Sequence, residues 1–201
     1  MSRQESALRS LVMDIHKVAK KGDRAGLWYP GYYPGGSYFV CDQFRFLKCF
    51  YSEDYPLPSA VSDGIKEFPY NSFWDRNIQL NWVRVRLPSE SELKEAQRKY
   101  DDFKLTLPDE FKYLDIKKKR SPCCWHFGGE YNYFNGFYLR QAIVSMKNPV
   151  GFIDPTVKWS HIYIRSEPEG TELLIWPVHP DRMICNPFYR CDELEILEAQ
   201  P

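Results

Sequence analysis

Residues 78–103, IQLNWVRVRLPSESELKEAQRKYDDF, place a predicted strand directly before a predicted helix. Apolar side chains alternate with polar ones over residues 78–87, which is the period of a half-buried strand. The alternation changes phase after Trp82, as a β-bulge or a strong local twist would produce. Ser89 and Glu92 have the spacing of a capping box, which predicts that a helix begins here.

The sequence before this stretch predicts one helix and then mainly extended chain. Residues 1–22 carry apolar side chains at i, i+3, i+4 and i+7 spacing, which is typical of an amphipathic helix. Residues 27–87 are expected to be mainly extended, with a Pro- and Gly-rich loop at 30–36 before a strand-like segment at 37–51. Within this segment, Arg45 falls on the same strand face as two apolar residues, Leu47 and Cys49.

The sequence after residue 88 predicts more helix and one further pair of strands. Residues 89–116 are expected to be helical, and the segment 121–201 begins with an aromatic loop. A buried helix is expected from Tyr138 to Met146, with a strand as the open alternative. Segments 157–165 and 172–178 flank a turn at Glu167-Pro168-Glu169-Gly170 and predict a β-hairpin.

Together these elements predict an α+β fold with a mostly antiparallel sheet, an N-terminal amphipathic helix and two or three further helices packed on the sheet. No internal repeat and no low-complexity linker divides the chain, so we expect residues 1–201 to form a single compact domain. A chain of 201 residues is long enough to bury a substantial core.

The composition is that of a folded protein with balanced charge. The chain has 27 basic and 27 acidic residues, which argues against a generic nucleic-acid or membrane-surface binder. No stretch approaches the roughly 18 apolar residues of a membrane span, and the first residues do not form a secretory signal. We therefore expect a cytoplasmic protein that does not contact a membrane, with its six cysteines reduced.

Aromatic residues concentrate in two turn-rich stretches, 28–51 and 125–138. Large amphipathic rings on irregular backbone suit a recognition surface, and tyrosine and tryptophan are enriched among interface hot spots. Our leading hypothesis is a non-enzymatic interaction protein, inhibitor-like or adaptor-like, that binds a protein partner. The residues expected to bind this partner are Tyr32, Tyr33, Trp125, Tyr131 and Tyr133. The same residues would serve a homodimer, and their location at the surface or in the core is left open.

An enzyme acting on a small or nucleotide-like substrate is the competing hypothesis. Its acid–base or nucleophilic groups would be Cys124, His126, His161 and His179, because thiols and imidazoles supply such chemistry. Cys123, Cys124 and His126 could also be zinc ligands, with Cys185 and Cys191 completing the site. The five residues between Cys185 and Cys191 exceed the usual spacing of paired zinc ligands, however. We therefore expect no metal and no cofactor, and buried or incidental thiols are the favoured interpretation of the cysteines.

A third hypothesis is single-stranded nucleic-acid binding. A basic run precedes the second aromatic stretch, and cations beside stacking rings are the ingredients of such sites. The residues concerned are Lys117, Lys118, Lys119 and Arg120. A solvated helix end is the favoured interpretation of the same run, because lysines are favoured there.

Overall fold

A computed structural model describes residues 3–21, 31–33, 37–42, 44–50, 66–67, 81–106, 123–127, 132–166, 170–178 and 196–197. Several predicted features lie outside these residues: the last part of the helical segment, 107–116, the basic run Lys117–Arg120, Tyr131, His179, Cys185 and Cys191. For Tyr32 and Tyr33 only the backbone is described.

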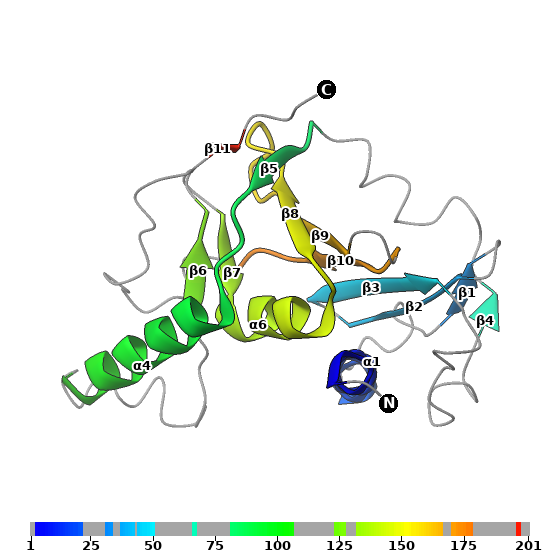
Figure 1. The fold of residues 1–201 in the computed structure, drawn as a ribbon, viewed down its shortest axis with the longest axis horizontal. Coiled ribbons are helices and arrows are strands. Elements are labelled where there is room, and N and C mark those ends of the chain that lie inside the picture. The colour runs from blue at the N-terminus through cyan, green and yellow to red at the C-terminus, as the bar shows by residue number, and fades with distance from the viewer. Residues whose placement is uncertain are drawn as a thin grey trace.

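The main sheet of the described residues has nine strands in the order β11-β5-β8-β9-β10-β3-β2-β1-β4 (Figure 1). Every pair in it is antiparallel except β1 with β4. The strands are β1 (Gly31–Tyr33), β2 (Ser37–Cys41), β3 (Arg45–Phe50), β4 (Lys66–Glu67), β5 (Val83–Val85), β8 (Pro149–Ile153), β9 (Ile162–Ser166), β10 (Glu172–Ile175) and β11 (Ile196–Leu197). A separate two-stranded ribbon joins β6 (Cys124–His126) to β7 (Tyr133–Asn135).

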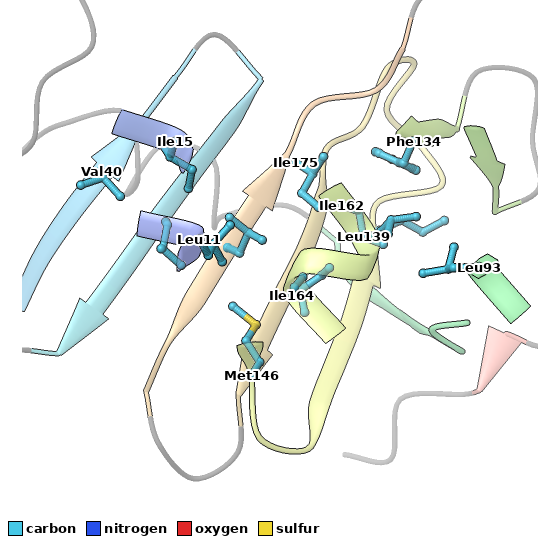
Figure 2. Packing of buried hydrophobic residues seen from close by; sticks show 14 of the residues in the cluster. Leu11, Ile15, Val40, Leu93, Phe134, Leu139, Met146, Ile162, Ile164 and Ile175 are labelled. Carbon is cyan, nitrogen blue, oxygen red and sulfur yellow. The ribbon is translucent and has the colours of Figure 1, made fainter. Parts of the chain in front are cut away.

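Among the described residues there are three helices, α1 (Arg3–Lys21), α4 (Glu90–Thr106) and α6 (Gly136–Ser145). Apolar residues of all three helices pack with residues from one face of the main sheet in a single buried cluster. Figure 2 shows Leu11 and Ile15 of α1 and Leu139 of α6 close to the strand residues Ile162, Ile164 and Ile175. The predicted α+β fold with a mostly antiparallel sheet is therefore confirmed.

The helix predictions that fall on described residues are confirmed, and local hydrogen bonds explain two of the helix starts. The Ser89 backbone N–H donates to the Glu92 carboxylate at 2.7 Å, and the Glu92 backbone N–H donates to the Ser89 hydroxyl at 3.2 Å. This capping box starts α4. The Asn135 side chain accepts from the backbone N–H groups of Phe137 and Tyr138, and α6 follows. The strand alternative for residues 138–146 is wrong.

Several strands differ from the predictions. The aromatic segment after residue 123 is not only loop, because it contains the β6–β7 ribbon, and the expected loop at 30–36 contains β1. Segment 37–51 forms two strands of a hairpin, with a turn after Cys41. Strand β8 was not predicted.

The hairpin expected from 157–165 and 172–178 is confirmed as β9 and β10, but β9 begins only at Ile162. Val157 and Trp159 lie in the preceding turn, and Trp159 has a left-handed φ of 67°. The buried Asp154 carboxylate holds this turn by accepting from the backbone N–H and the hydroxyl of Thr156. No helix within the described ranges is long and apolar enough to cross a membrane.

Candidate functional site

The turn between β2 and β3 creates a buried ion pair. The Asp42 carboxylate accepts from the backbone N–H groups of Phe44 and Arg45, both at 2.7 Å. This is the arrangement by which aspartate closes a turn with its own side chain. The same carboxylate accepts from the Arg45 side chain, at 3.0 Å from Nε and 2.6 Å from Nη2. Both side chains are completely buried.

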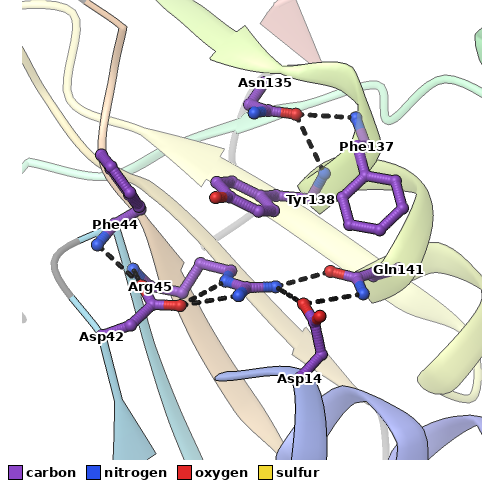
Figure 3. Close-up of polar contacts among 8 residues, drawn as sticks. All are labelled: Asp14, Asp42, Phe44, Arg45, Asn135, Phe137, Tyr138 and Gln141. Carbon is purple, nitrogen blue, oxygen red and sulfur yellow. Dashed lines mark hydrogen bonds and ion pairs between the residues drawn. The ribbon is translucent and has the colours of Figure 1, made fainter. Parts of the chain in front are cut away.

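Arg45 also connects two helices that are distant in the sequence. Its Nη1 donates to Asp14 of α1 at 2.9 Å and to Gln141 of α6 at 2.6 Å. The Gln141 amide donates to Asp14 at 3.2 Å, and the Tyr138 ring centre lies 4.0 Å from the guanidinium carbon. We call these five residues, Asp14, Asp42, Arg45, Tyr138 and Gln141, the Arg45 cluster (Figure 3).

The electrostatics of the Arg45 cluster favour a structural role. Arginine stays protonated in proteins. All three guanidinium nitrogens of Arg45 donate hydrogen bonds, and the acceptors are Asp42, Asp14 and Gln141. Burial raises the pKa of Asp42, while the charge and hydrogen bonds of Arg45 oppose that rise. Burial also raises the pKa of Tyr138. A paired, buried charge network of this kind orients α1 and α6 relative to β3.

A groove lies between α1 and α6, beside the Arg45 cluster. One hollow of about 190 Å³ is mainly apolar, and its lining residues are Ala7, Ser10, Leu11, Phe137, Arg140, Gln141, Val144 and Ser145. A more polar hollow of about 460 Å³ has a different lining, Ser6, Arg9, Ser10, Met13, Asp14, Lys17 and Gln141. Because Ser10 and Gln141 line both, the two hollows are neighbours along α1. We call them together the α1–α6 groove.

Phe137 places an exposed ring at this groove. It is 46 % exposed, which is unusual for a phenylalanine. It lies two residues after the cap residue Asn135, and its backbone N–H donates to the Asn135 side chain. In Figure 3 the Tyr138 ring lies over the Arg45 guanidinium, whereas the Phe137 ring lies away from it. The first turn of α6 thus directs the Tyr138 ring into the cluster and leaves the preceding ring, Phe137, exposed at the surface.

Those of the predicted partner-binding aromatic residues that the structure describes fall into two separate places. Trp125 is half-buried and packs against the core, and Tyr133 is half-buried with its ring stacked on His126 at 4.2 Å. Both belong to the β6–β7 ribbon. Figure 1 shows this ribbon and β1, which carries Tyr32 and Tyr33, at opposite ends of the molecule.

Two of the cysteine and histidine candidates, Cys124 and His161, are in environments that suppress their reactivity. Burial, together with the neighbouring Cys123, raises the pKa of the Cys124 thiol to about 12. Burial lowers the pKa of His161 to about 4, and its ring meets Trp176 edge-on at 4.6 Å. Cys124 and His126 lie on β6, whereas His161 precedes β9 of the main sheet. Within the described ranges, no three His, Cys, Asp or Glu side chains are grouped so that they could hold a metal ion.

Sequence reasoning did not identify the α1–α6 groove or the Arg45 cluster. One signal was present, because Arg45 shares a strand face with Leu47 and Cys49, and a charge on a buried face must be paired. Nothing comparable marked Phe137 or Gln141. No family model, no curated protein and no solved structure matches this chain.

Proposed function

We propose that the chain is a protein-binding module and that the α1–α6 groove is its binding surface. The observation that carries this proposal is the half-exposed Phe137 ring beside a small, mainly apolar hollow. Exposed aromatic rings next to apolar hollows are typical of interface hot spots. In such interfaces a side chain of one protein fills a pocket on the other.

The Arg45 cluster supports the proposal because it preorganises the groove. Asp14 and Gln141 line the polar hollow and are both hydrogen-bonded to the fully buried Arg45. The two helices are therefore held at a defined separation before a partner arrives. A preorganised surface loses less conformational entropy on binding, which favours affinity.

The chemistry of the described residues favours binding over catalysis. A nucleophilic cysteine needs a lowered thiol pKa, and the pKa of Cys124 is raised instead. An acid–base histidine works best with a pKa near the operating pH, and the pKa of His161 lies at about 4. The carboxylates of the Arg45 cluster are committed to the guanidinium.

The proposal can be tested by site-specific photo-cross-linking in the cells that make the protein. p-Benzoylphenylalanine is introduced at position 137 in the full chain, and cross-linked adducts are identified by mass spectrometry. The matched control carries the same group at position 105, because Leu105 is 77 % exposed and does not line the groove. We expect a discrete protein adduct from position 137 that is absent from position 105.

An adduct of twice the chain's mass would identify the partner as a second copy of the protein. The proposal would be overturned if position 137 formed no discrete adduct, or if both positions captured the same set of proteins.

A further inference from the structure

We infer that the α1–α6 groove takes an acidic segment of the partner, which inserts one apolar side chain beside Phe137. This inference rests on the proposed function and specifies the chemistry of the partner. It depends on two properties of the groove, the size of its apolar hollow and the charge of the neighbouring polar hollow.

The apolar hollow has the size of a single side chain rather than of a small-molecule site. Its volume of about 190 Å³ lies below the roughly 300–1,000 Å³ of typical ligand pockets. Leu11 and Val144 supply aliphatic walls, and Phe137 supplies an aromatic one. An aliphatic or aromatic side chain of a partner fits these walls, whereas a polar one would lose its hydrogen bonds to water there.

The polar hollow is lined by cations whose charge no described acid neutralises. Arg9, Met13 and Lys17 follow one another at four-residue spacing, so they form a stripe along one side of α1. Arg9 and Lys17 are exposed, and neither forms an ion pair with any side chain that the structure describes.

Among the described residues, Asp14 is the carboxylate that lines this hollow, and it does not cancel the positive charge. Asp14 already accepts from Arg45 at 2.9 Å and from Gln141 at 3.2 Å. The α1 sequence as a whole contains five lysine and arginine residues and two acidic ones. Charge complementarity therefore selects carboxylates in the partner and disfavours basic segments.

The geometry sets the spacing of the two partner features. Leu11 and Lys17 are six residues apart on α1, which corresponds to about 9 Å along a helix axis. An extended segment covers that distance in about three residues. The partner segment should therefore carry an aspartate or glutamate about three positions from its apolar anchor.

Random twelve-residue peptides displayed on phage are the probe for this inference. The library is selected on the folded full chain after depletion on the Phe137→Asp variant. Enriched peptides are expected to share an apolar residue with an acidic residue about three positions away. Their affinity, measured by fluorescence polarisation, should fall about tenfold or more in the Arg9→Glu, Lys17→Glu double variant and should weaken as salt is raised.

The control is Arg84→Glu, which reverses an exposed cation on β5 outside the groove and should leave peptide affinity unchanged. Enriched peptides that are basic or without charge preference would overturn the acidic partner and leave the proposed binding groove standing. A selection that enriches nothing on the wild-type chain relative to Phe137→Asp would count against the groove itself and hence against the proposed function. Circular dichroism of each variant establishes that it is folded.

Discussion

Replacement of Arg45 by methionine tests whether the Arg45 cluster holds the helices in place. Arg45→Met keeps much of the side-chain length and removes the charge that faces the completely buried Asp42. Loss of one partner of a buried ion pair costs about 3–5 kcal/mol, because the other charge is left uncompensated. The bond to Asp14 adds at most about 1 kcal/mol, since that carboxylate is 36 % exposed. The free energy of unfolding of a domain is about 5–15 kcal/mol, so the variant should lose a large share of its stability.

Urea unfolding followed by tryptophan fluorescence measures this loss as a change in the free energy of unfolding. Arg140→Met is the matched control, because Arg140 pairs with Glu90 at 3.0 Å while 44 % exposed, and it should cost no more than about 1 kcal/mol. The double variant Arg45→Met, Asp42→Asn should recover part of the loss, since neither charge then remains buried alone. A loss for Arg45→Met no greater than that of the control would refute the reasoning.

The destabilisation by Arg45→Met should also depend on pH with a defined sign. Arg45 opposes the burial that raises the pKa of Asp42 above its usual 3.8, so its removal raises the folded-state pKa further. A carboxyl with a higher pKa in the folded state contributes stability below its unfolded pKa and loses it as pH rises through its folded pKa. The deficit of the variant relative to the wild type should therefore shrink as pH falls from neutrality toward about 4. Repeated urea titrations would contradict this if the deficit grew on acidification.

Three further predictions concern single residues. Gly136→Ala should cost about 1–3 kcal/mol in thermal unfolding, because its new Cβ would lie 2.8 Å from the Sγ and 2.9 Å from the carbonyl oxygen of Cys123. When Cys123 is also replaced by alanine, Gly136→Ala should retain most of that cost, since the backbone carbonyl of residue 123 is still present. Cys124 should resist iodoacetamide near pH 8 in the folded protein and react in urea, because burial raises its pKa to about 12, and peptide mass spectrometry would disprove this by finding rapid labelling without urea. His161 should stay neutral from pH 8 to about 5 in an NMR titration, because burial lowers its pKa from the ordinary 6.5 to about 4. The contribution of the neutral ring to stability is therefore present above pH 6.5 and is lost as the pH falls toward 4. Titration of its ring near pH 6.5 in the folded protein would contradict that environment.

The helices could be predicted because their signals are local in the sequence. Ser89 and Glu92 are three residues apart, and their reciprocal hydrogen bonds require nothing beyond the first turn of α4. The apolar stripe of α1 likewise follows from residue spacing, and Leu11 and Ile15 are buried as that stripe predicts.

Short strands were harder to predict because their stability depends on distant partners. Strand β8 begins with Pro149 and contains Gly151, two residues that are unfavourable in strands. It forms nonetheless, because β5 and β9 pair with it on both sides. Gly151 suits this position, since a Cβ there would come within 2.5 Å of the Leu87 side chain. That close approach exists only in the folded chain.

The candidate site divides in the same way between sequence and tertiary structure. The sequence by itself determined that α1 is an amphipathic helix and that Arg45 shares a strand face with Leu47 and Cys49, because both depend only on residue periodicity. Tertiary packing alone decided that Asp14 and Gln141, 31 and 96 residues away, meet this arginine. A buried guanidinium must be paired, but which side chains pair with it depends on the docking of α1 and α6, and that docking also forms the groove.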